Sequence, residues 1–223
     1  LTDRSVCDRL QPVAQTVRSG GDTMSDPCGT RDRILAVARS QFAQNGYHGT
    51  SMDAIVKETG LSKGALYWHF EGKSDLFAAV LAREVDRMIH SHVEASRGEG
   101  QDVRAFVTLR GERTIEMLWE DREMRLLFFT LFIERLRGGE EGRELSQVAG
   151  DLLEVIQEKL WPVAREVFPA FRHREAYQKM LTTLRFLMNG IIMELGFSLD
   201  LDSAREYWRF AIGRFEFQSE GFK

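Results

Sequence analysis

The sequence predicts an all-α protein of about nine helices, with a small three-helix domain at residues 29–76 followed by a larger helical bundle at residues 77–223. Apolar residues recur three and four positions apart along most of the chain, which is the period of an amphipathic helix. Glycine, proline and aspartate interrupt this pattern at 121, 138–139, 162, 169 and 200–202. Apolar and polar residues nowhere alternate over a long stretch, so strands are not expected.

The composition indicates a globular protein with enough chain for two modest domains, since 43% of its 223 residues are apolar and 29% are charged. The net charge of −4 does not by itself indicate nucleic acid as a partner. No run of 18 apolar residues occurs, so a membrane span is not expected. Residues 1–28 lack the apolar core of a signal peptide, which makes the cytoplasm the expected location.

Residues 1–28 are polar, and we expect them to form a disordered or loosely attached arm. One hypothesis places the native start of translation at Met24, which an intact mass from the native host would test. The rival hypothesis is a basic arm for the DNA minor groove, but aspartates offset its arginines. Cys7 and Cys28 suggest neither a metal site nor a disulfide framework.

The first expected helix covers residues 31–45. Thr30 is its expected cap, Gly46 follows its end, and Tyr47 is expected to be buried. Two short helices are then expected on either side of Gly60, which can take a positive φ at the turn. A longer helix should run from Lys73 to about residue 96.

The two short helices have the capping residues and apolar faces of a helix-turn-helix. Thr50 and Asp53 fit a capping box at the start of the first helix. Ser62 can cap the second helix, while Leu66 and Phe70 lie on one face and should pack inward. An ordinary pair of core helices remains the simpler alternative.

The first turn of the second helix is the part of a recognition helix that reaches base edges in DNA, and here it contains Lys63, Gly64 and Ala65. Tyr67, His69 and Lys73 carry groups suited to phosphate oxygens. Residues 30–76 contain six Lys or Arg and five Asp or Glu, so binding must depend on placement, with acidic groups turned away from the DNA.

The stretch from Thr30 to Phe77 resembles the N-terminal domain of TetR-type repressors. The resemblance rests on Gly46-Tyr47, Thr50-Ser51-Met52, Ile55, the run from Gly60 to Phe70, and Lys73 to Phe77. It implies that Lys63, Gly64 and Ala65 face bases and that Ser51, Tyr67, His69 and Lys73 hold phosphates, with Thr50 as a weaker candidate. We expect Trp68 to pack against the protein. Thr59 and Val56 depart from the family pattern, where alanine is common.

The body is expected to contain helices at about 102–120, 122–137, 140–160, 172–197 and 202–217, with a possible short helix at 162–171. Its bulky apolar residues fit an ordinary bundle core. The resemblance also implies a small-molecule pocket between these helices, for which the candidates are Phe106, Met117, Leu118, Phe128, Phe132, Trp161, Phe186, Asn189 and Met193.

The last two expected helices are candidates for a two-fold dimer interface, although packing within one chain would explain their apolar stripes equally well. The resemblance favours the dimer. The candidate interface residues are Leu184, Leu187, Gly190, Ile191, Leu195, Trp208 and Phe215, with Tyr207 beside them.

No catalytic motif, cofactor motif or metal-ligand spacing is evident. His90 and His92 diverge by about 200° on a helix and are expected to be exposed. The sequence therefore predicts a homodimeric, ligand-responsive transcriptional regulator, most simply a repressor, that binds a palindromic DNA operator and is released by a small apolar or amphipathic effector. Two alternatives are a non-specific, architectural DNA-binding protein and a helical small-molecule-binding protein or enzyme with a vestigial DNA head.

Overall fold

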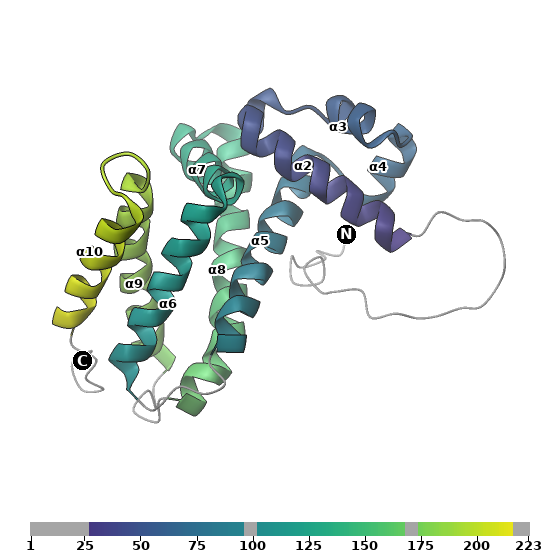
Figure 1. Ribbon diagram of the computed structural model, residues 1–223. Coiled ribbons are helices and arrows are strands. Elements are labelled where there is room, and N and C mark those ends of the chain that lie inside the picture. Colours follow the sequence, from purple (N-terminus) through teal and green to yellow (C-terminus); the bar gives the residue numbers. More distant parts are fainter. Residues whose placement is uncertain (1–26, 96–101, 168–173, 216–223) are drawn as a thin grey trace. The chain divides into compact units, whose positions relative to one another are not determined.

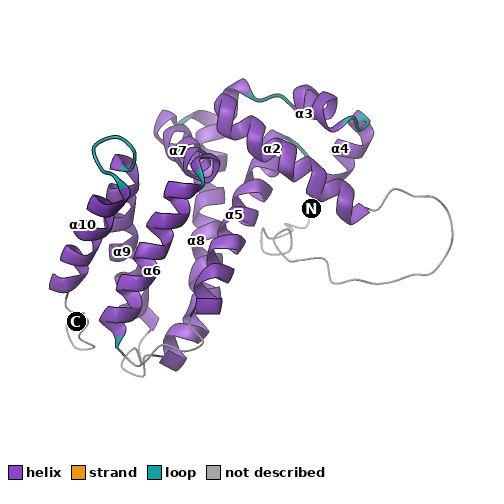
Figure 2. Cartoon of the chain, viewed as in Figure 1, coloured by secondary structure: helices purple, strands orange, loops and turns teal. Residues whose placement is uncertain are grey.

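The computed structural model of the protein describes residues 27–95, 102–167 and 174–215. In these ranges the chain forms nine helices and no strand, which confirms the predicted fold class (Figures 1 and 2). The helices in chain order are α2 (Pro27–Gly49), α3 (Met52–Thr59), α4 (Lys63–His69), α5 (Lys73–Ala95), α6 (Val103–Glu120), α7 (Arg122–Arg137), α8 (Gly139–Val167), α9 (Arg174–Glu194) and α10 (Leu201–Arg214).

The chain forms two compact units, and neither is a continuous segment. Among the described residues, the head unit comprises 27–84 and 126–152, and the body unit comprises 85–95, 102–125, 153–167 and 174–215. All three crossings between the units therefore fall inside helices, within α5, α7 and α8, and not in loops. The expected arm at 1–28 lies almost wholly outside the described residues, and the expected domain division after residue 76 stays a prediction.

The structure differs from the sequence prediction at two expected helix breaks. Gly46 interrupts helical geometry at the predicted place, with φ 69° and ψ −177°, yet helical turns resume and carry α2 to Gly49. The break expected at Pro162 does not occur, because α8 continues through it to Val167. Pro162 removes only the backbone bond to the carbonyl of residue 158, close to the end of the helix. The short helix considered for 162–171 is thus partly the end of α8 and partly outside the described residues.

The head unit packs its helices around aromatic and branched side chains. Phe42 of α2 meets Phe77 of α5 edge to face at 4.8 Å between ring centroids, and Tyr47 lies 5.5 Å from the same ring. Ile55 and Leu66 are fully buried. Tyr47 is only 2% exposed, as predicted. The aromatic contacts thus join α2 to α5, and the burial of Ile55 and Leu66 shows that α3 and α4 each turn one side toward the interior of the unit.

In the body unit, α6 and α10 pack closely because Gly111 leaves room for an indole. The Trp208 ring lies over Gly111, and its Nε1 donates a hydrogen bond to the Thr108 carbonyl at 3.0 Å. Ion pairs link the same helices, joining Arg205 to Glu116 and Arg209 to Glu112.

Trp208 is only 2% exposed, as is Leu195, and Leu184 is 8% exposed. The prediction that these three residues contact a partner subunit is therefore wrong, because each is covered by its own chain. The buried face of α9 is formed by Tyr177, Met180 and Leu184 at helical spacing.

The opposite face of α9 is exposed, which corrects part of the predicted pocket. Phe186 is 61% exposed, Met193 is 43% exposed, and Asn189 is exposed as well. These three side chains do not lie inside the unit, so they do not line an internal pocket. Leu118 is 1% exposed and belongs to the tightly packed core. Phe128 and Phe132 belong to the head unit, whereas Phe106, Met117 and Trp161 are half-buried in the body unit.

His92 of α5 is half-buried, contrary to the expectation that both histidines of this helix are exposed. Its Nε2 lies 3.0 Å from the Thr114 hydroxyl. Burial, followed by the nearby guanidinium groups of Arg110 and Arg113, lowers the pKa of the imidazole to about 4. Folded His92 is therefore neutral at neutral pH.

We expect His92 to make the protein less stable in mild acid. Below its ordinary pKa of 6.5, an unfolded His92 takes up a proton that the folded side chain does not accept until about pH 4, so stability falls across this window. The free energy of unfolding in urea should fall by about 2 kcal/mol more between pH 7 and pH 5 in the wild type than in His92→Gln. Equal pH dependence in both proteins would contradict this assignment.

Candidate nucleic-acid interface

The helix-turn-helix is defined by side-chain and glycine caps. The Ser51 hydroxyl accepts a hydrogen bond from the Ala54 amide at 3.1 Å at the start of α3. Gly60 ends α3 in the left-handed conformation, with φ 67°. The Ser62 hydroxyl accepts from the Ala65 amide at 3.1 Å at the start of α4. The two short helices therefore lie on either side of Gly60, and Ser62 caps the second one, as the sequence predicts.

Thr50 does not have its predicted roles. It is 2% exposed, and its hydroxyl lies 2.8 Å from the Gly46 carbonyl and 3.0 Å from the Gln41 carbonyl. A buried hydroxyl that bonds its own backbone is not available to a phosphate. The cap of α3 is Ser51 instead of Thr50, so the predicted capping box is also wrong.

The recognition helix α4 buries one side and exposes the other. Leu66 and Phe70 pack inward at 0% and 2% exposure, as predicted. Lys63 and Gly64 are exposed, and Ala65 is partly exposed. A Cβ atom added at Gly64 would meet only the Ser62 hydroxyl, at 3.8 Å. The predicted base-reading turn is therefore accessible.

Trp68 is the functional candidate that the sequence reasoning missed. It is 75% exposed, and its neighbour Tyr67 is 52% exposed, so the expectation that Trp68 packs against the protein is wrong. The signal was present in the spacing. Trp68 lies two residues from both Leu66 and Phe70, about 200° around the helix from the buried side. It thus adds an exposed indole to the outer face of α4.

Lys63 has an acidic neighbour on the adjacent helix. Its Nζ lies 2.7 Å from Oδ1 of Asp53, in the first turn of α3, and both side chains are largely exposed. The hydrogen bond to this carboxylate, together with its charge, raises the pKa of the Lys63 ammonium above its ordinary value. The expectation that acidic groups turn away from the recognition helix is therefore wrong for Asp53.

The side chains that are predicted to contact phosphates differ in charge. Burial, followed by the charge of Arg31, lowers the pKa of His69, so its ring is neutral at neutral pH and can offer a hydrogen bond but no charge. Lys73 is half-buried with its Nζ 4.3 Å from the centroid of the Tyr47 ring. Burial, followed by the carboxylates of Glu141 and Glu144, raises the pKa of Tyr47 to about 12. Tyr47 therefore stays neutral beneath the Lys73 ammonium.

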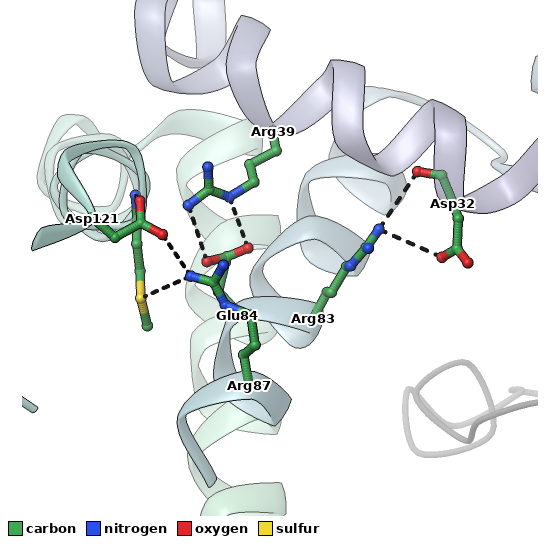
Figure 3. Close-up of polar contacts among 7 residues, drawn as sticks. Asp32, Arg39, Arg83, Glu84, Arg87 and Asp121 are labelled. Atoms are coloured by element: carbon green, nitrogen blue, oxygen red, sulfur yellow. Dashed lines mark hydrogen bonds and ion pairs between the residues drawn. The ribbon is translucent and has the colours of Figure 1, made fainter. Parts of the chain in front are cut away.

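Two ion pairs hold α2 against α5 in the head unit (Figure 3). Arg39 donates to both carboxylate oxygens of Glu84, at 2.9 and 3.4 Å, and the Glu84 side chain is only 2% exposed. Arg83, on the same helix, lies 3.5 Å from Asp32, and both of these side chains are largely exposed. The first pair is buried and the second is open to water, although they join the same two helices.

The second arginine of α5 acts within the body unit. Arg87 reaches Asp121 at 2.6 Å, between α6 and α7 (Figure 3). The other oxygen of Asp121 accepts from the Met124 amide at 2.9 Å. Asp121 therefore caps the start of α7 and fixes that junction to α5.

Comparison with known proteins identifies the domain that contains this site. Residues 34–80 match the family model described as bacterial regulatory proteins of the tetR family. The match to this family is confined to that segment. The match covers α3, α4 and the start of α5, and so contains the predicted DNA contacts from Ser51 to Lys73.

Curated relatives that the chain matches are regulators of transcription, the class of protein that the sequence predicts. UidR from Escherichia coli K12, an HTH-type transcriptional regulator, is 29% identical over 131 residues, which are 59% of this chain and 64% of UidR. The alignment thus spans less than two thirds of that relative. The transcriptional repressor AcnR from Corynebacterium efficiens is 28% identical over 151 residues, which are 61% of this chain and 80% of AcnR.

A solved structure of the TetR-like fold extends the comparison to most of the chain. FadR from Bacillus subtilis, in complex with stearoyl-CoA, has a TM-score of 0.58 and 17% identity, and the match covers 81% of this chain and 96% of FadR. At this identity the likeness establishes the fold only.

Neither a metal centre nor a membrane helix emerges from the described residues. No group of three or more His, Cys, Asp or Glu side chains within the described ranges is arranged to hold a metal ion. No helix in the described part of the chain is long and apolar enough to cross a membrane.

Proposed function

We propose that this protein is a DNA-binding transcriptional regulator, most simply a repressor, which binds a palindromic operator as a homodimer and is released by a small-molecule effector. The exposed outer face of α4 carries this proposal. Lys63, Gly64, Tyr67 and Trp68 are accessible there, while Leu66 and Phe70 anchor the helix to the core. Helices presented in this way enter the major groove, where base edges are read.

The proposed DNA contacts fall into two classes. Lys63, Gly64 and Ala65 would face base edges. Ser51, Tyr67, His69 and Lys73 would bond phosphate oxygens, with Trp68 as an added contact. Base contacts determine sequence preference, whereas phosphate contacts determine register and overall affinity. Removal of the Lys73 ammonium should therefore weaken binding to all DNA sequences alike.

The proposed effector is small and apolar or amphipathic, and its site is in the body. FadR, which shares the fold, was solved with stearoyl-CoA, a molecule of this class. Phe106, Met117 and Trp161 are the predicted pocket residues that remain half-buried in the body unit. An effector that binds a state with low DNA affinity must weaken DNA binding by the same factor by which DNA weakens effector binding.

The proposed dimer surface is the exposed face of α9 with the neighbouring side chains of α10. Leu187 is 37% exposed, and Gly190 has no atom within 4 Å of an added Cβ, so a second helix can approach closely there. Tyr207 and Phe210 of α10 are 59% and 57% exposed. These apolar groups suit an isologous contact with a second copy of the chain. Ile191 and Phe215 are half-buried and remain candidates.

Leu187→Asp is expected to give monomers, because two carboxylates would be buried against each other at the two-fold axis. Sedimentation velocity at micromolar concentration would measure this. Leu109→Asp is the matched control, because Leu109 has nearly the same exposed fraction as Leu187, at 40%, but lies on α6. An unchanged dimer for Leu187→Asp, or dissociation by Leu109→Asp alone, would move the interface elsewhere.

Selection of bound fragments from the host genome by the purified protein tests the proposed function. At about 0.15 M salt, non-specific electrostatic binding is weak, so a regulator should recover a few related, near-palindromic sites. Lys73→Gln should recover the same sites with lower yield. Equal recovery of all sequences would indicate an architectural DNA-binding protein. Recovery of nothing, with or without a bound effector, would indicate a vestigial head.

A further inference from the structure

An ion pair occupies the surface that the proposed function assigns to base recognition. The Lys63 ammonium and the Asp53 carboxylate lie 2.7 Å apart, with side chains 63% and 67% exposed. They come from different helices, one from the first residue of α4 and the other from the first turn of α3. The outer face of the motif thus presents a donor and an acceptor side by side.

One base pair presents the complementary arrangement. In the major groove, guanine offers the acceptors O6 and N7, and cytosine offers the N4 amino group as a donor. O6 and N4 belong to the same base pair and are hydrogen-bonded to each other, so they lie about 2.9 Å apart. This separation matches the distance between Nζ of Lys63 and Oδ1 of Asp53. Lysine is a common partner of guanine, and aspartate can accept from cytosine N4.

We propose that Asp53 and Lys63 act together as one reader of a single G·C base pair in each half-site, with Lys63 donating to guanine and Asp53 accepting from the N4 amino group of cytosine. The pair forms before DNA arrives, so both side chains are already placed. Asp53 is then a specificity-determining residue.

The surroundings of the pair favour base contact over phosphate contact. A carboxylate beside a phosphate is repelled, whereas beside a cytosine amino group it gains a hydrogen bond. Gly64 follows Lys63, and a Cβ added there would meet only the Ser62 hydroxyl, at 3.8 Å, so no side chain at this position keeps the pair away from the groove. Glu58, at the other end of α3, bonds Gln41 of α2 and has no contact with α4 among the described interactions. The two acids of α3 therefore have different surroundings.

The test rests on the proposed function and uses the full-length protein with the operator that wild-type protein selects. Dissociation constants are measured for the operator and for variants in which each base pair is replaced in turn, symmetrically in both half-sites. Asp53→Ala, Lys63→Ala, the double variant and Glu58→Gln are compared. Glu58→Gln is the matched control because it removes one exposed negative charge from the same helix. Asp53→Ser is a second variant that retains a residue suited to a helix start.

We expect Asp53→Ala and Asp53→Ser to reduce discrimination at one G·C pair per half-site by about tenfold, and Lys63→Ala to reduce it at the same pair. The double variant should lose little more than either single variant. N4-methylation of that cytosine should mimic Asp53→Ala. Glu58→Gln should leave the preference at every position unchanged.

Other outcomes would overturn the inference. Asp53→Ala could strengthen binding to operator and scrambled DNA equally while every base preference stays as in the wild type. Asp53 would then act only by repelling the DNA backbone. Effects of Asp53 and Lys63 at different base pairs would also overturn it. These results leave the proposed function intact, whereas failure of the wild type to select any operator removes both.

Discussion

Gly111→Ala is expected to lower the free energy of unfolding by about 3 kcal/mol. An added Cβ would lie 1.9 Å from Cε2 of Trp208 and 2.1 Å from its Nε1. The indole cannot move aside easily, because it is 2% exposed and its Nε1 is hydrogen-bonded to the Thr108 carbonyl. Alanine favours helices over glycine by about 1 kcal/mol, and the overlap must exceed this gain. Urea unfolding followed by circular dichroism measures the change.

Gly213→Ala is the matched control for this substitution. Gly213 lies in α10 of the same unit, and an added Cβ there meets no atom within 4 Å. This variant should be as stable as the wild type or up to about 1 kcal/mol more stable. Trp208→Leu should relieve the overlap, so Gly111→Ala should cost much less in that background. A similar effect of both glycine substitutions would show that the indole is not fixed.

Glu84→Gln is expected to destabilise the protein by about 3 kcal/mol, because it weakens a buried ion pair. The Glu84 carboxylate accepts two bonds from the Arg39 guanidinium, and only 2% of its side chain is exposed. Glutamine keeps one acceptor oxygen but turns an amide donor toward a guanidinium that has only donors. Urea unfolding gives the stability, and hydrogen exchange should show faster opening of α2.

Arg83→Gln provides the comparison on the same two helices. The side chains of Arg83 and Asp32 are 47% and 60% exposed. Loss of the ion pair between them should therefore change the free energy of unfolding by no more than about 0.5 kcal/mol. Replacing Arg39 and Glu84 together by methionine should restore part of the stability that Glu84→Gln loses, since apolar groups need no charged partner. Equal costs for Glu84→Gln and Arg83→Gln would mean that water reaches both pairs.

Apolar spacing predicted most of the fold because it reports which side of each helix is buried. The repeats through Ile34, Phe42, Leu66 and Phe77 belong to one core, and all four residues are buried. Caps and glycines placed α3 and α4 correctly. The cap itself could not be chosen from sequence, since Thr50 and Ser51 are both suitable residues and only folding shows which hydroxyl is buried.

Contacts between distant segments could not be predicted from one sequence. The long helix α9 is apolar on two faces, and spacing does not reveal which face meets the rest of the chain. Trp208 looked suitable for an interface because its partner, Gly111, lies almost one hundred residues earlier and has no side chain to signal the contact. The pairing of Asp53 with Lys63 across the turn depends likewise on the angle between two helices.

The head unit consists of two separate segments of the chain, which are synthesised at different times. Its first segment ends at residue 84 and its second segment ends at residue 152. At translation rates of about 5 to 20 residues per second, the ribosome needs several seconds more to deliver the second segment after the first. Throughout that interval the nascent DNA-reading motif lacks the helices α7 and α8 that complete its unit. During synthesis the incomplete head unit is therefore open to chaperones and proteases for several seconds.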